Sequence, residues 1–108
     1  MSNAAQNWLD TKYQNKNSSG KIELYNRDTG DSEELTGELL IENYTNIEEI
    51  SLTRWGKKGK ITKVTIANCP QVKKIRFENN EITEIIFKDS LLNLEWLDLF
   101  DNKIKEID

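Results

Sequence analysis

The sequence contains no histidine, and it has only one cysteine and one proline. Histidine is the usual general base and the commonest metal ligand, so its absence removes the main participant of most hydrolase and metalloenzyme mechanisms. We therefore expect no enzymatic activity, no metal site and no cofactor. The single cysteine, Cys69, allows no intrachain disulfide, which fits a reducing compartment, and we expect an intracellular, cytoplasmic protein.

The sequence is also short of apolar residues and of positive charge. Apolar residues make up 36% of the 108 residues and charged residues 31%, and a single globule of that composition would struggle to fill a large core. A repeat structure needs only a narrow apolar stripe in each repeat. The formal net charge of −4 argues against a general affinity for nucleic acid. The sequence shows neither a secretory leader nor an apolar stretch that would span a membrane, so we expect no membrane association.

Two segments of the sequence repeat one pattern 22 residues apart. Residues 72–82 and 94–104 both read L-x-x-L-x-L-x-x-N-x-L, with an apolar residue at each L and asparagine at the N. A degraded copy begins at residue 47, which is 25 residues before the next one, and Trp55 stands where its asparagine is expected. Each L-x-L has period two, which is typical of a short strand with one buried face.

A second pattern lies between these copies. Residues 61–69 align with residues 82–90, a third copy begins at Ile104, and residues 35–41 look like an incoming first turn. The chain therefore alternates two kinds of apolar segment, and each kind predicts one strand per repeat. Cys69 ends one of these segments, so we expect its thiol to be buried in the coil and unreactive.

Together these segments resemble the leucine-rich repeat over residues 35–108, in particular the internalin-like class with repeats of roughly 21 to 22 residues. The resemblance implies a right-handed solenoid of short parallel β-strands with little helix. Asn80 and Asn102 would turn into the coil and bond backbone groups of neighbouring turns, which would otherwise be buried unpaired. The alternative is an ordinary β-meander with surface asparagines, which gives no reason for asparagine to recur at a fixed offset.

The N-terminal residues predict a helix over residues 3–14 that covers the first exposed turn of the solenoid. Trp8, Leu9 and Tyr13 share one stripe of this helix, which would pack on the repeats. The lead-in at residues 5–10 resembles the start of some expanded fungal repeat families. That likeness implies nothing about activity.

The domain organisation follows from these segments. We expect residues 1–34 to form an N-terminal cap, with the helix followed by an edge strand at residues 22–24 and a polar loop at residues 26–34. Residues 35–108 would then be leucine-rich repeats that end without a cap. Because Asp108 falls within a repeat, either the natural protein continues or the open last coil associates with another chain.

The residues between the buried positions should line one open face of the strands, where equivalent residues of successive strands form columns. The first column holds Glu49, Lys74 and Trp96, the second Ser51, Arg76 and Asp98, and the third Thr53, Glu78 and Phe100. Three pairs of opposite charge then face each other: Glu49 with Lys74, Arg76 with Asp98 and, on the second strand set, Lys63 with Glu84. Exposed pairs of this kind contribute less than about 1 kcal/mol each to the free energy of unfolding. Their main effect is therefore to fix the register of neighbouring strands.

This face is our candidate for partner binding. The predicted binding residues are Lys74, Arg76, Trp96, Asp98 and Phe100. Trp and Arg are enriched at the energetic hot spots of protein interfaces, and large aromatic side chains on a solvent-facing strand surface are unexpected otherwise. The alternative is that Trp96 and Phe100 cover the open C-terminal edge or pack on a further repeat.

A basic loop forms a second candidate site, for an anion such as a phosphate, an acidic peptide or a nucleic-acid backbone. Its residues are Arg54, Trp55, Lys57, Lys58, Lys60 and Lys63. The alternative is an ordinary solvated loop, because its two glycines do not form a phosphate-binding motif.

The function that we expect is therefore a protein-interaction scaffold that binds a protein or peptide partner on the open strand face, as leucine-rich repeats generally do. Two alternatives remain open. The first is an anionic-ligand or nucleic-acid binder that acts through the basic loop. The second is a non-catalytic stub of a larger repeat protein, which would self-associate through its open C-terminal coil.

Overall fold

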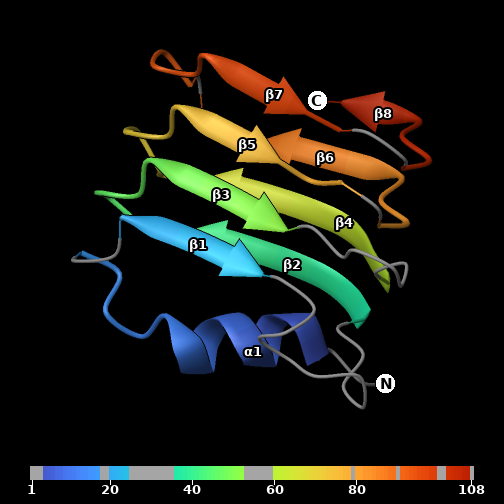
Figure 1. Cartoon of the computed structure of the whole chain (residues 1–108), viewed down its shortest axis with the longest axis horizontal. Coiled ribbons are helices and arrows are strands. Elements are labelled where there is room, and N and C mark those ends of the chain that lie inside the picture. The colour runs from blue at the N-terminus through green and yellow to red at the C-terminus, as the bar shows by residue number, and fades with distance from the viewer. Residues whose placement is uncertain are drawn as a thin grey trace.

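The strands of the protein form two parallel sheets, and the chain alternates between them (Figure 1). The computed structural model describes residues 4–17, 20–24, 36–52, 60–78, 80–89, 91–99 and 102–107. The elements are, in chain order, α1 (Ala4–Lys12), β1 (Lys21–Leu24), β2 (Thr36–Glu42), β3 (Glu49–Leu52), β4 (Lys60–Ala67), β5 (Lys74–Arg76), β6 (Glu84–Phe87), β7 (Trp96–Asp98) and β8 (Glu106–Ile107).

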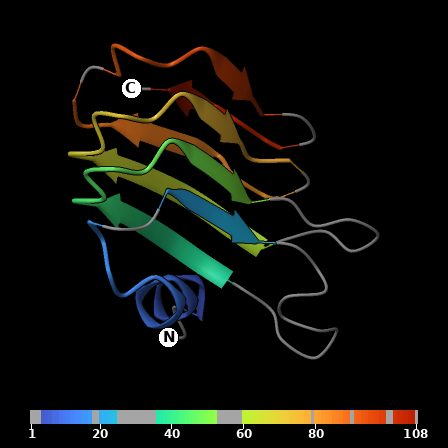
Figure 2. The ribbon, with the colours of Figure 1, turned by 60° about the vertical axis from the view of Figure 1, so that its left-hand side comes forward.

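One sheet has the strand order β1-β3-β5-β7 and the other the order β2-β4-β6-β8, and all neighbouring strands are parallel. We refer to them as the odd sheet and the even sheet. The strands of the two sheets run in opposite directions, and the sheets lie face to face (Figures 1 and 2). Each odd strand and the even strand that follows it form one layer, and the four layers stack on α1. The expectation of short parallel strands with little helix is thus confirmed.

The core lies between the sheets, because each strand turns alternate side chains inward. In β5, Ile75 is fully buried while its neighbours Lys74 and Arg76 are exposed. The buried apolar side chains form one cluster, whose larger members include Tyr44, Phe77, Leu9, Ile22, Leu39, Ile41, Ile47, Ile50, Leu52 and Ile61. Parallel sheets are normally covered on both faces, whereas here the outward side chains of β5 are left to solvent.

The strand register confirms the first two columns that the sequence predicts. In the third, Thr53 and Phe100 lie outside the described residues, and Glu78 is buried and not on an open face. Glu49 faces Lys74, and Lys74 in turn faces Trp96. Arg76 faces Asp98 in the neighbouring column. On the even sheet Lys63 faces Glu84, and their charged groups lie 3.7 Å apart.

Asn80 and Asn102 point into the structure and bond the backbone of neighbouring layers, as predicted. Asn80 Nδ2 donates to the carbonyl of Leu52, at 2.8 Å, and to that of Glu78, at 3.1 Å. Asn102 Nδ2 donates to the carbonyls of Phe77 and Leu99, and its Oδ1 accepts from the amide of Ile82. Each asparagine therefore supplies partners to backbone groups at or after the end of an odd strand, where the chain turns away from the ladder.

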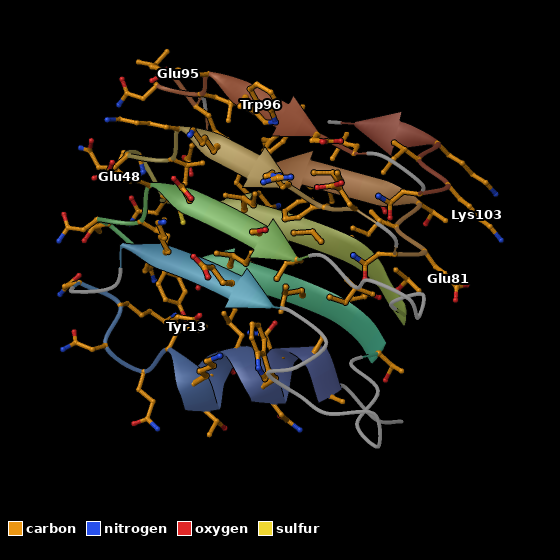
Figure 3. The ribbon with its side chains drawn as sticks, viewed as in Figure 1. Tyr13, Glu48, Glu81, Glu95, Trp96 and Lys103 are labelled. Carbon is orange, nitrogen blue, oxygen red and sulfur yellow. The ribbon has the colours of Figure 1, made fainter. Side chains whose placement is uncertain are left out.

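The helix lies at the β1–β2 end of the stack and closes the free edges of both first strands (Figure 1). The Gln6 amide brackets Leu40 of β2, because its Oε1 accepts from the Leu40 amide at 2.6 Å and its Nε2 donates to the Leu40 carbonyl at 3.1 Å. The Tyr13 hydroxyl does the same for Glu23 of β1, at 3.0 Å to the amide and 3.3 Å to the carbonyl (Figure 3). These two side chains stand where a further strand would pair, so the edges cannot recruit one.

Removing the Gln6 amide should loosen the edge of β2. We expect Gln6→Ala to lower the free energy of unfolding by about 0.5–1.5 kcal/mol and to speed hydrogen exchange of the Leu40 amide, since two hydrogen bonds are lost at a site that water can reach. Urea unfolding and amide exchange measured by NMR test this. Asn7→Ala, on the exposed side of the same helix, is the matched control. Unchanged exchange at Leu40 would contradict the closing role of Gln6.

The even strands end in a ladder of Asn43, Asn68 and Asp89. Asn43 and Asn68 both have positive φ angles, of 67° and 52°, which asparagine tolerates better than most residues. Asn68 Nδ2 donates to Asn43 Oδ1 at 3.0 Å, and its backbone amide donates to Asp89 Oδ2 at 2.7 Å. These residues occupy the same turn in three successive layers, and their bonds tie the turns together.

Several expectations can be compared directly with these elements. The helix predicted over residues 3–14 spans Ala4–Lys12, with Leu9 buried and Trp8 and Tyr13 packed against the core. The edge strand expected at residues 22–24 is β1. The polar loop at residues 26–34 lies outside the described residues. Among the described residues, no helix is long and apolar enough to cross a membrane.

Candidate functional site

The candidate site is the outward side of the odd sheet, which we call the outer face. Its side chains are Lys21 and Glu23 of β1, Glu49 and Ser51 of β3, Lys74 and Arg76 of β5, and Trp96 and Asp98 of β7. Parallel strands lie about 4.8 Å apart, so the columns bring charged and aromatic groups of neighbouring strands into contact range. Four of the five predicted binding residues lie here, and Phe100 is outside the described residues.

In the β1–β3 half of the outer face, one lysine lies between two glutamates. Lys21 Nζ lies 3.8 Å from a carboxylate oxygen of Glu23 and 3.6 Å from one of Glu49. The sequence paired Glu49 with Lys74, but the structure directs the Glu49 carboxylate to Lys21 on the other side. The predicted facing of Glu49 with Lys74 is present in the register, but a residue in a column has a neighbour on each side, and the Glu49 carboxylate lies near the other one.

Arg76 pairs with the carboxylate of Glu78, which the sequence analysis assigned to another column. Its Nε and its terminal nitrogen both approach Oε1 of Glu78, at 3.2 Å and 3.1 Å. Glu78 is only 8% exposed, so its charge needs a close cationic partner. Arg76 therefore has a structural task besides any binding role, and half of its side chain remains exposed.

Lys74 and Trp96 are the accessible pair of the outer face. They face each other across β5 and β7. The Lys74 side chain is exposed, and among the described residues no carboxylate lies within ion-pair distance of its ammonium. Trp96 is 56% exposed on the outward side of β7 (Figure 3). The pair thus combines a charge without a partner and a large apolar surface exposed to water.

Of the predicted basic loop, only Lys60 and Lys63 are among the described residues, and neither belongs to the outer face. Arg54, Trp55, Lys57 and Lys58 lie outside the described residues. Lys60 begins β4 and Lys63 follows within it, so both belong to the even sheet. The Lys63 ammonium lies 3.7 Å from Glu84 and 4.0 Å from Glu38, which already compensate its charge.

Comparison of the chain with protein-family models, curated proteins and solved structures found no match. The assignment of a function therefore depends on the outer face and on the other surfaces of the molecule.

One other surface is hollowed, and it was not predicted from the sequence. A groove of about 430 Å³ lies between α1 and the outward side of the even sheet. Its lining residues are Gln6, Asp10, Glu38, Leu39, Leu40 and Thr65. Leu40 is 41% exposed there, and the Gln6 side chain is already engaged with Leu40 and Asp10. The only sequence signal would have been Leu40, an apolar residue at an outward position of the β2 pattern.

Within the described residues, no three Cys, Asp or Glu side chains are grouped in a way that could hold a metal ion. Cys69 is 1% exposed, as predicted, and its thiol lies 3.4 Å from the Ala67 carbonyl and 3.7 Å from the Ile41 carbonyl. Burial raises the pKa of this thiol, because the thiolate would lose its hydration. The thiol is therefore a poor nucleophile in the folded protein.

We expect Cys69 to resist iodoacetamide in the folded protein and to react quickly in urea. A raised folded pKa contributes stability that is present below the unfolded pKa and is lost as the pH rises through the folded value. Cys69 therefore predicts falling stability above about pH 8.5, and Tyr44, whose pKa is also raised by burial, adds to the loss only above about pH 10. Urea unfolding at pH 7 and pH 10 measures this, and Cys69→Ala should reduce the difference. Equal stability at both pH values would contradict the assignment.

Proposed function

We propose that this protein is a repeat scaffold of the leucine-rich type that binds a protein or peptide partner on its outer face. The support for the scaffold is the alternation of the chain between two parallel sheets in matched layers, with asparagines that bond from one layer to the next. A preformed sheet loses little conformational entropy on binding, which makes rigid presentation an efficient mechanism.

The exposure of Trp96 is the observation that carries the binding proposal. A tryptophan that is 56% exposed, beside an ammonium without a carboxylate partner, has the composition of an interface hot spot. The other large exposed apolar residues are separate from this combination: Leu40 lies on the even sheet, Leu92 is in a turn and Leu97 faces inward. Among the described residues, the outer face is therefore the best candidate for recognition.

Trp96→Ala tests the proposal. We expect this substitution to weaken binding of a partner captured from an extract of the source cells. The binding free energy should fall by about 2 kcal/mol, or roughly thirtyfold in affinity, while the variant stays folded. Leu40→Ala, which removes an exposed apolar side chain from the opposite sheet, should leave binding unchanged. Circular dichroism confirms that both variants fold. Equal binding by the two folded variants would remove the outer face from consideration.

Anion binding through the basic loop stays a separate prediction. Of its residues, only Lys63 has a described side chain, and that side chain is engaged by two glutamates. Binding that depends strongly on salt and survives Trp96→Ala would favour this alternative.

A further inference from the structure

Within the part of the chain that the structure describes, carboxylates compensate the charges of Lys21 and Arg76 on the outer face, and none compensates that of Lys74. Glu23 and Glu49 accompany Lys21, and Glu78 accompanies Arg76. Lys74 is flanked in its column by Glu49, which is directed to Lys21, and by Trp96. Its ammonium therefore stays exposed on a surface that otherwise matches each cation with an acid.

We propose that Lys74 and Trp96 form a subsite for one acidic residue and an adjacent apolar residue of an extended partner segment. This inference rests on the proposed function, because it names the chemistry of the partner that the outer face would bind. A carboxylate would pair with the Lys74 ammonium, and an apolar side chain would cover the Trp96 ring. Covering the ring also removes water from the ion pair, which strengthens it.

The strand geometry fits such a segment. Lys74 and Trp96 are direct neighbours across two parallel strands, which lie about 4.8 Å apart. In an extended peptide, residues i and i+2 point to the same side and lie about 6.6 Å apart. A segment that crosses β5 and β7 can therefore place a carboxylate over Lys74 and the apolar residue two positions away over the indole.

The surrounding charges restrict the partner to a single carboxylate at this point. Glu49 lies on one side of Lys74, and Asp98 shares β7 with Trp96. The outer face also carries Glu23, and Glu78 lies just beyond β5. A run of acidic residues, or the phosphates of a nucleic acid, would meet these carboxylates at close range and be repelled. The subsite thus selects an isolated acid within an apolar context.

Blocked, dye-labelled heptapeptides test the subsite directly with the full chain. One peptide carries glutamate and leucine two positions apart among serine and glycine, a second has glutamine in place of the glutamate, and a third has glycine in place of the leucine. Fluorescence anisotropy gives their dissociation constants. We expect the glutamate–leucine peptide to bind up to about fivefold more tightly than the glutamine peptide, because an exposed ion pair contributes up to about 1 kcal/mol. We also expect it to bind more tightly than the glycine peptide, which leaves the Trp96 ring uncovered.

Two charge reversals supply the protein-side control. Lys74→Glu should abolish the preference for glutamate over glutamine, whereas Lys88→Glu, which makes the same charge change at an exposed position after β6, should keep it. Equal binding of the glutamate and glutamine peptides, equal behaviour of the two variants, or no binding of the glutamate–leucine peptide at millimolar concentration would each overturn the subsite.

The outcomes separate this inference from the proposed function. If Trp96→Ala weakens the captured partner while the peptides show no preference for glutamate, the outer face binds partners and the subsite is wrong. If Trp96→Ala and Leu40→Ala behave alike with the captured partner and with all peptides, both proposals fail.

Discussion

Replacing Phe77 with alanine is expected to lower the free energy of unfolding by about 3–5 kcal/mol, the largest effect of any single change considered for this chain. Phe77 is fully buried and is one of the largest side chains in the core. It follows β5, and its backbone is also engaged, since its amide donates to the Asp98 carbonyl at 2.8 Å and its carbonyl accepts from Asn102. The cavity would therefore open at the contact between the third and fourth layers.

Urea unfolding followed by circular dichroism measures this loss. Small domains are stable by about 5–15 kcal/mol, so Phe77→Ala should unfold at much lower urea or lack a folded baseline altogether. Phe77→Leu keeps most of the apolar volume and should cost clearly less. Leu92→Ala, at a position that is 89% exposed, provides the reference for a surface truncation. A loss at Phe77 no larger than the loss at Leu92 would show that the core is not packed as described.

Asn80→Ala should lower the free energy of unfolding by about 2 kcal/mol, although it removes only one small polar group. Asn80 is fully buried, and its amide serves the carbonyls of Leu52 and Glu78. A buried carbonyl that loses its donor costs about 1–3 kcal/mol, because no water replaces the bond. The loss should appear in the urea midpoint of the whole domain, since the bond to Leu52 connects two layers.

Asn93→Ala is the matched control for this change. Asn93 is exposed and also donates from its amide to a backbone carbonyl, that of Pro70, at 3.2 Å. At that exposed site water can take the place of the amide, so the expected cost is within about 0.5 kcal/mol. If the two alanine variants lost equal stability, burial would not be the reason why asparagine stands at position 80.

The sequence predicted those contacts that recur with the repeated sequence pattern. The facing of Lys74 with Trp96 and of Arg76 with Asp98 followed from aligning the copies, because a parallel register reproduces the sequence offset. The inward turn of Asn80 and Asn102 followed for the same reason. Their recurrence at a fixed offset indicated a role that a surface residue would not have.

Two kinds of contact could not be predicted from the sequence. One is a contact that occurs only once in the chain, and the other is a side chain that could pair with either of two neighbours. Gln6 bonds Leu40 across 34 residues, and no pattern marks a glutamine on the flank of a helix. Arg76 could turn to Asp98 or to Glu78, and spacing alone cannot rank the two. The Asn43–Asn68–Asp89 ladder did leave a signal, because Asn68 and Asp89 occupy the same position of the aligned segments 61–69 and 82–90.

The first and fourth strands of the odd sheet differ in how firmly they are held. Gln6 and Tyr13 bond the backbone of β2 and β1, whereas Leu97 of β7 is 42% exposed at a position where Ile75 of β5 is fully buried. Because less apolar surface is buried at β7, its local opening should cost less free energy than that of β5. Trp96 belongs to this strand. A partner bound there would therefore also hold β7 in place, and its affinity would include the free energy of that ordering.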